Sequence, residues 1–497
     1  MSLTEKARLR GPRAARQRRD EQASKGTPIL VIVFLFMLIS PAAAIFYFGP
    51  LVMTPLRLFL LIITIPILLR FLLTVKLRIY DYLFIFSSIW YGFCHALNYG
   101  VGKGLQFGGL YFIFVIGTYA LVQISIRKSE QIESVFRIVL FILIGLLPFA
   151  VMESFTGVRL ISDVTGKIFG TSIGIQSDQR LGLYRAATSF AHPILYGLFC
   201  VATFSFIWYS TGPLVLRFLK TVVVTVAVFF SLSAGALVPL LLQILLIFCE
   251  RVSRGIRYRA QYVIWGFLGL YTFLETFANS GAFGVMTRML TLNAHTAYYR
   301  KAIWEYGIDD VMRHPIFGFV SENWTRPHWM TGSVDNHWLA LLMRSGFVGT
   351  GALLLAIVII FVKMMRRPDI DLPRVYANMR RASFYSLFAI CVAGATVAFF
   401  DKMEPIFAFY IGIAALFARW EDQAATHGAD AGRPSRRKAL RQPGRLAPSN
   451  GPPEPAPDHH TASPDAPASP RKRRARPHIA NGPQRRDGQF GPTNRRF

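Results

Sequence analysis

Long apolar segments, separated by short polar ones, make up most of the sequence. Most of them approach the roughly 20 residues that an α-helix needs to cross the hydrocarbon layer of a membrane. They lie at about 28–48, 51–75, 80–98, 105–125, 135–153, 187–209, 219–233, 235–249, 260–278, 338–362, 383–400 and 405–419. The pattern predicts an all-α polytopic membrane protein with about 12 transmembrane helices.

The segment at 219–249 is ambiguous, because it is long enough for one tilted helix or for two short helices joined at 233–236 (Ser-Ala-Gly-Ala). Basic clusters between membrane spans normally face the cytoplasm. If the segment forms two helices, the four arginines between 251 and 259 lie on the same side as the other basic clusters. If it forms one helix, they lie on the opposite side. The charges therefore favour two helices and place both termini in the cytoplasm.

This topology divides the chain into three parts. A basic segment at 1–27 precedes the membrane domain at 28–419, and a basic, Pro-rich tail at 420–497 has too little apolar surface to fold. Two outer loops, at 154–186 and 279–337, are much longer than the others. We expect a function at the outer face to use these two loops.

Composition agrees with a membrane protein and excludes a nucleic-acid-binding one. Hydrophobic residues make up 53% and charged residues 16%, whereas soluble domains carry about 25% charged residues. The mean hydropathy is +0.38. The net charge of +28 is concentrated in both terminal segments and in short clusters beside apolar segments. Such clusters set membrane topology, so we expect no nucleic-acid partner.

Several common catalytic sites have no counterpart in the sequence. There is no phosphate-binding loop of the Gly-Lys-Ser/Thr type and no His-Glu-x-x-His metal motif. The four cysteines form no Cys-x-x-Cys pair. Asp369 and Asp371 match the Asp-x-Asp of soluble glycosyltransferases, but no nucleotide-binding domain surrounds them. We therefore predict no metal site and no cofactor.

The first outer loop ends with Arg185 shortly before His192-Pro193, where the next apolar segment begins. Arg185 is expected at the depth of the outer lipid headgroups, either as a snorkelling anchor or as a phosphate ligand. Pro is favoured in the first turn of a helix, so His192 is expected to cap that helix or to contribute to a site beside Arg185.

The second outer loop contains a predicted helix at 297–312. Arg300, Trp304, Ile308 and Val311 fall on one face of it, with Asp309 nearly opposite. Such a helix lies in the membrane interface and points its arginine at the level of lipid phosphates. Arg300 either binds a phosphate or helps to anchor the loop, and Arg288 is a second phosphate candidate.

The same loop continues with residues 314–318 (His-Pro-Ile-Phe-Gly) and ends with Asp335-Asn336-His337 at the start of the next span. His337 is expected to cap that span at its outer mouth, facing the same layer as Arg185 and Arg300. With an ordinary pKa of about 6.5 it can also accept a proton at neutral pH. Glu305 and Asp335 are candidates to orient it.

These residues, in this order, resemble the superfamily of O-antigen ligases and polysaccharide polymerases (Wzy-like proteins). The resemblance spans about 30–420 and rests on six short motifs. They are Arg185 with His192-Pro193, Ser-x-Ser-x-Gly-Ala at 231–236, Arg300-x-x-x-Trp304, His314 to Gly318, Asp335-Asn336-His337, and Gly346-x-x-Gly349. One departure is Ala234, where many members carry arginine.

The resemblance implies a metal-independent membrane glycosyltransferase of the GT-C type. Such enzymes transfer a glycan from a polyprenyl diphosphate carrier to an acceptor hydroxyl at the outer face of the bacterial cytoplasmic (inner) membrane. It implies catalytic roles for Arg185 and Arg300 at the diphosphate and for His337 near the acceptor. Further candidates for substrate binding are Arg288, His192, Trp304, His314 and Asp335. Membrane lipids, a chain-length regulator, a flippase and export proteins are the expected partners.

Within the family, residues 324–330 (Trp-Thr-Arg-Pro-His-Trp-Met) look more like an exopolysaccharide polymerase than a lipopolysaccharide ligase. A ligase remains the first alternative. Transport or lipid flipping is the alternative from another class, but coupled transporters usually keep an ionisable residue near the membrane midplane. Here Glu153 and Glu404 lie at span ends, and the long loops follow no two-fold repeat.

Overall fold

The computed structural model describes residues 27–49, 51–171, 178–253, 294–319 and 324–431, with a few single positions between 256 and 276. All elements belong to one compact unit within residues 1–433. The helices are α2 (Ile29–Leu38), α3 (Pro55–Thr74), α4 (Ile79–Tyr99), α5 (Val101–Phe112), α6 (Thr118–Ser125), α7 (Ser129–Thr156), α8 (Leu160–Phe169), α9 (Pro193–Trp208), α10 (Leu214–Phe230), α11 (Ala234–Val252), α14 (Ala294–Arg313), α15 (His337–Met364), α16 (Arg374–Ala393) and α17 (Met403–Ala431).

Short elements complete the unit. A π-helical turn, η1 (Ile113–Gly117), joins α5 to α6, and a 3₁₀ turn, η3 (Asp369–Asp371), precedes α16. Strands β1 (Phe46–Phe48) and β2 (Leu51–Met53) pair antiparallel with Tyr47 opposite Val52. Strands β3 (Gln179–Arg180) and β4 (Leu183–Tyr184) form a second hairpin.

The prediction of a helical membrane protein is confirmed. Within the described part of the chain, six helical segments are long and apolar enough to cross a membrane. They are α3, α5 to α6, α7, α11, α15 and residues 403–423 of α17. The shorter helices α2 and α9 are also apolar. The predicted span at 260–278 lies outside the continuous described segments.

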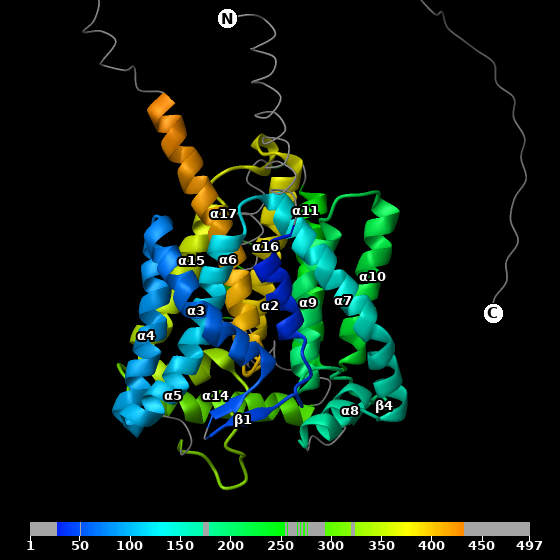
Figure 1. The fold of residues 1–497 in the computed structure, drawn as a ribbon, viewed down its shortest axis with the longest axis vertical. Coiled ribbons are helices and arrows are strands. Elements are labelled where there is room, and N and C mark those ends of the chain that lie inside the picture. Colours follow the sequence, from blue (N-terminus) through cyan, green and yellow to red (C-terminus); the bar gives the residue numbers. More distant parts are fainter. Residues whose placement is uncertain are drawn as a thin grey trace, which may run out of the picture. The chain divides into compact units, whose positions relative to one another are not determined.

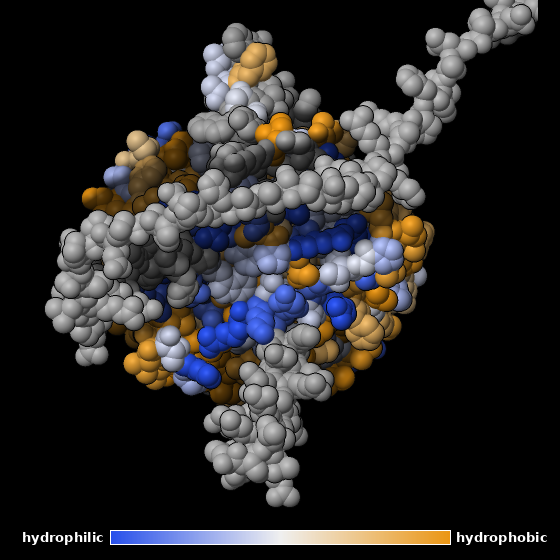
Figure 2. All heavy atoms as spheres, turned by 90° about the horizontal axis from the view of Figure 1, so that it is seen from above, coloured by the Kyte–Doolittle hydropathy of each residue, from blue (hydrophilic) through white to orange (hydrophobic). Residues whose placement is uncertain are grey.

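Central helices are buried and peripheral ones expose apolar side chains. Almost every residue of α9 is buried, whereas α3 exposes Ile62 (64%) and Leu73 (83%). Figure 1 shows α9 and α16 in the interior and α3, α4 and α10 at the periphery. Seen from the end at which α17 emerges, polar residues occupy the middle of the face and hydrophobic residues its rim (Figure 2). An apolar rim around a polar end is the arrangement that a lipid bilayer requires.

The two-helix prediction for 219–249 is confirmed. α10 ends at Phe230 and α11 begins at Ala234, with a turn between them in which Leu232 has φ 42°. The turn packs tightly against α9, because a Cβ on Gly197 would lie 2.6 Å from the side chains of Ser231 and Ala236. Small residues at this turn therefore serve close helix packing.

The boundaries of three predicted spans are wrong. The first span, predicted to 48, ends at Leu38, because Pro41 lacks a helical donor and the following aromatic residues form β1. The span predicted at 383–400 begins at Arg374 and ends at Ala393. α17 continues beyond 419 to Ala431, since its charged continuation is held by ion pairs.

Those ion pairs form a network around the end of α17 that lies far from α14. Arg419 binds Asp81 at 2.8 Å, and Lys363 binds Asp422 at 2.5 Å. Arg380 binds Asp369 at 2.6 Å, so the Asp-x-Asp motif is held by an arginine of its own chain. This motif therefore has a structural role.

A break in α15 ties the segment after α14 to the bundle. Gly346 has φ 61° and ψ −171° inside the helix. The interrupted turn pairs with the loop, because Phe347 N donates to Pro315 O at 2.7 Å and Phe319 N donates to Met343 O at 2.6 Å. The loop thus replaces hydrogen bonds that the helix loses.

Gly346→Ala is expected to destabilise the protein. A Cβ there would lie 2.1 Å from Ile316 O, and the positive φ disfavours any side chain, at a cost of about 1–3 kcal/mol or more. Gly351→Ala is the matched control, since nothing lies within 4 Å of its Cβ position in the same helix. Thermal unfolding in detergent checks the pair, and equal melting temperatures for both variants would contradict this account.

Candidate functional site

Arg185 lies between β4 and the turn that joins α10 to α11. Its side chain is buried, with Nη1 3.4 Å from Asp178 Oδ2 and Nε donating to Ser231 O at 3.5 Å. The backbone is fixed as well, because Arg185 N donates to Asp178 O and Ala186 N donates to Phe230 O. Burial, and then the charge of Arg180, lower the pKa of Arg185 to about 10, so it remains protonated at neutral pH.

Two further arginines surround this position. Arg180 lies 3.7 Å from the same Asp178 carboxylate and donates to Leu232 O. Arg159 pairs with Glu153 at 3.1 Å. Glu153 also accepts hydrogen bonds from the backbone N–H groups of Ala187 and Thr188. Sequence reasoning missed both arginines, because the loop that contains them has no helical periodicity.

The predicted helix at 297–312 is confirmed as part of α14, which lies across one end of the bundle (Figure 1). Ile303 and Val311 are buried in a cluster with Leu339 and Met343 of α15, and Trp304 packs at its edge. Gly307 permits this close approach, since a Cβ there would lie 2.6 Å from Met343. Asp309 is exposed, as predicted.

Arg300 is half-buried on this helix. Its Nε is buried without a hydrogen-bond partner among the described residues. Burial lowers the pKa of Arg300, the charge of Arg180 lowers it further, and the carboxylate of Asp335 opposes the shift. Arg180 of the first outer segment therefore lies close enough to Arg300 for the two like charges to interact.

The four arginines 159, 180, 185 and 300 are called the arginine cluster below. Three carboxylates interact with it, those of Glu153, Asp178 and Asp335. Guanidinium groups bind phosphate through parallel charge-assisted hydrogen bonds, and a buried unused donor such as Arg300 Nε is costly without such a partner. The cluster is therefore suited to a di-anionic phosphate ligand.

His192 caps α9, as predicted. Its Nδ1 accepts a hydrogen bond from Ile194 N at 3.2 Å. Burial first, and then the charges of Arg185, Arg159 and Arg180, lower its pKa from 6.5 to about 4. The imidazole is thus neutral at pH 7, in the form that the cap requires.

Acidification is expected to destabilise the protein through His192. In the unfolded chain its pKa lies near 6.5 and in the folded chain near 4, so the unfolded state binds the proton more readily and stability falls as pH drops through this window. Between pH 7 and pH 5 the loss amounts to about 2 kcal/mol. His192→Asn keeps a capping side chain without titration, so its unfolding free energy should fall less over this range. Equal losses for both proteins would contradict the assignment.

The side chain of His337 lies elsewhere than expected. Asn336, not His337, caps α15, because its Oδ1 accepts from Leu339 N at 3.0 Å and its Nδ2 donates to Ala395 O. An amide side chain is a better cap than an imidazole. His337 is buried, and its ring stacks on Phe399 with centroids 4.2 Å apart.

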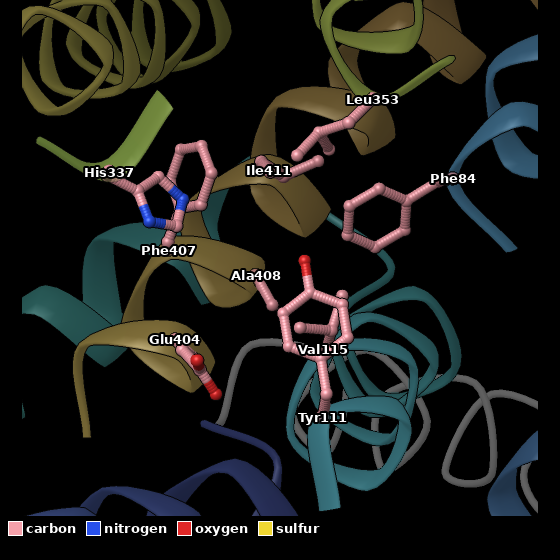
Figure 3. Close-up of a pocket in the computed structure, with 9 residues that line it drawn as sticks. All are labelled: Phe84, Tyr111, Val115, His337, Leu353, Glu404, Phe407, Ala408 and Ile411. Atoms are coloured by element: carbon pink, nitrogen blue, oxygen red, sulfur yellow. The ribbon is translucent and has the colours of Figure 1, made fainter. Parts of the chain in front are cut away.

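His337 therefore faces the interior of the bundle. It lines a cavity of about 10 Å³ together with Tyr111, Glu404 and Phe407, among others. Figure 3 shows the carboxylate of Glu404 and the hydroxyl of Tyr111 on the same cavity as the imidazole. A cavity of this size holds about one water molecule.

A charged group that sequence reasoning missed lies near this cavity. Arg344 is in α15, two residues before the break at Gly346, and is hydrogen-bonded to Tyr91 of α4. Its charge acts on both His337 and Glu404. The position of Arg344 inside an apolar segment was the available signal, because an ionisable residue there is rarely without a function.

Three predicted candidates remain, His314, Glu305 and Arg288. His314 follows α14 and is exposed, with its ring 5.7 Å from that of Phe319. Glu305 pairs with Lys301 at the exposed surface of α14, so its expected role in orienting His337 is wrong. Arg288 lies outside the described residues.

A comparison with protein-family models gives no match, and a comparison with curated protein sequences gives none either.

Proposed function

We propose that the protein is a metal-independent membrane glycosyltransferase of the GT-C type with 12 spans. It polymerises polyprenyl-diphosphate-linked repeat units into an exopolysaccharide or O-antigen-like polymer at the outer face of the bacterial cytoplasmic membrane. The single observation that carries the proposal is the arginine cluster. It gathers four guanidinium groups from two separate segments at the end of the bundle where α14 lies.

In the proposed mechanism the donor diphosphate binds to the arginine cluster. As the bond between the sugar C1 and the phosphate oxygen breaks, negative charge grows on the departing diphosphate. Guanidinium groups already held by Asp178, Ser231 and Leu232 stabilise that charge without further reorganisation. Arg300, with its unused buried Nε, is the group most free to respond to the charge.

His337 takes the proton of the attacking hydroxyl, an effect typically worth about 10²–10⁴-fold. Its ring is buried against Phe399 and Phe407. The acceptor hydroxyl therefore reaches it only when the segment at 394–402 moves aside. His337 N donates to Gly394 O and Val397 O, so this segment is connected directly to the start of α15.

A ligase and a transporter or lipid flippase are the two alternatives to a polymerase. The 324–330 stretch favours a polymerase over a ligase, and it packs through the buried Trp324 and Met330 beside α14. Transport or lipid flipping is favoured by one observation, the presence inside the bundle of two ionisable groups that interact through their charges, Arg344 and Glu404. That pair adjoins His337, so it is equally suited to controlling the acceptor side of a transferase.

Carrier-linked glycans in cells that lack the protein test the proposal. Single repeat units outside the cytoplasm, removed when the wild-type gene is restored, indicate a polymerase. Long chains that remain on the carrier indicate a ligase. Units that accumulate on the cytoplasmic side would overturn the proposal in favour of flipping.

A further inference from the structure

An apolar groove lies at the start of α3, outside the arginine cluster. Its volume is about 340 Å³, within the range of about 300–1,000 Å³ typical of small-molecule sites. Apolar side chains of β2, α3, α5 and η1 line it, with Arg57 and Gln106 as the polar members. Leu105 on its wall is 72% exposed.

One hydrogen-bond donor of Arg57, Nε, has no acceptor among the described residues. Its Nη1 donates to Val52 O at 2.8 Å, which fixes the side chain against β2. Its Nε is buried, and no described residue accepts a hydrogen bond from it. A cation with an unused donor at the wall of an apolar groove is suited to an anionic group that carries an apolar chain, because each part then meets its complement.

The groove and the arginine cluster lie on different sides of the unit. In Figure 1, α3 and α5 lie on one side of the unit and α8 and β4 on the other, with α14 crossing between them. Arg57 is close enough to Glu404 for their charges to interact. Glu404 in turn lines the cavity that contains His337. The groove therefore adjoins the His337 side of the proposed site.

We propose that this groove holds the lipid of the acceptor, a polyprenyl chain whose phosphate pairs with Arg57. This inference rests on the proposed function, in which two lipid-linked glycans are joined. While one diphosphate occupies the arginine cluster, the second carrier needs its own cation and its own apolar surface. The groove supplies both, on the side at which the acceptor hydroxyl meets His337.

Native mass spectrometry of the full chain in detergent, with added polyprenyl diphosphate, tests the assignment. The wild type should bind two lipid molecules. Arg57→Gln should bind the second at least about tenfold more weakly, the effect expected from losing a charge-assisted hydrogen bond. Leu105→Trp fills the groove at an exposed position and should give the same result. Arg70→Gln, at an exposed arginine on the same helix, should still bind two.

Weakened binding of one lipid in both groove variants supports the proposal. Two tightly bound lipids in either variant would overturn it. Displacement of the second lipid by an equal amount of phosphatidylglycerol would also overturn it, because the groove would then be a site for bulk membrane lipid. This experiment measures bound lipid and not the formation of glycosidic bonds. A negative result can therefore be distinguished from failure of the proposed function, which is measured by polymer length.

Discussion

Replacing Arg300 with Gln is expected to lower the rate of polymer formation by about 10²–10³-fold, the usual effect of removing one preorganised donor from a developing anion. Arg300 Nε is buried and has no partner among the described residues, and Arg180 and Asp335 are its charged neighbours. Gln cannot replace either the charge or the two-pronged geometry. Restoring the variant gene to cells that lack the protein, and measuring the lengths of carrier-linked glycans, checks the prediction.

Two variants control this experiment. Arg300→Lys keeps the charge but loses the fork of donors, so it should recover only part of the activity. Lys301→Gln removes a neighbouring charge on the same helix, where Lys301 is exposed and paired with Glu305. It should behave as wild type. Normal polymer from Arg300→Gln that is inserted at normal levels would refute the role of the arginine cluster.

Breaking the ion pair between Arg419 and Asp81 is expected to destabilise the protein strongly. Asp81 is completely buried and Arg419 nearly so. The carboxylate binds Arg419 at 2.8 and 2.9 Å, Tyr119 Oη at 2.5 Å and Arg78 N at 2.6 Å. Arg419→Met leaves this charge without its counter-ion, which typically costs about 3–5 kcal/mol. Unfolding in detergent monitored by circular dichroism measures the loss.

The matching control is an exposed pair. Lys301 and Glu305 lie 3.2 Å apart with both side chains more than half exposed. Such pairs contribute about 0–1 kcal/mol, so Lys301→Gln should change stability little. The double variant Asp81→Leu with Arg419→Met should recover part of the stability, because no buried charge then remains unpaired. If Arg419→Met alone were as stable as the wild type, the ion-pair network would not be what holds α17.

Hydropathy and charge predicted most of the helices. They separated α10 from α11 correctly, because four arginines after 250 forced that choice. Boundaries failed where tertiary contacts decide them. Arg374 and Arg380 make the start of α16 polar, yet the helix forms because Arg380 binds Asp369 and Glu421. No pattern in one sequence reveals such distant partners.

The candidate site was predicted in part. Periodicity identified the helix that carries Arg300, and the turn chemistry identified His192 as a cap. Sequence reasoning could not foresee that Arg180 lies close enough to Arg300 for their charges to interact, because that depends on the β3–β4 hairpin. It also assigned the cap of α15 to His337, although the adjacent Asn336 has the better capping chemistry.

The most direct test of the central claim is bond formation by the purified protein. Wild type, Arg300→Gln, His337→Gln and Lys301→Gln would each be incubated with a polyprenyl-diphosphate-linked repeat unit in detergent containing a metal chelator. The account predicts carrier-linked chains longer than one repeat from wild type and Lys301→Gln, and single units from the other two. Equal chain lengths from all four proteins, or no elongation by the wild type until the chelator is saturated with a divalent metal, would contradict it.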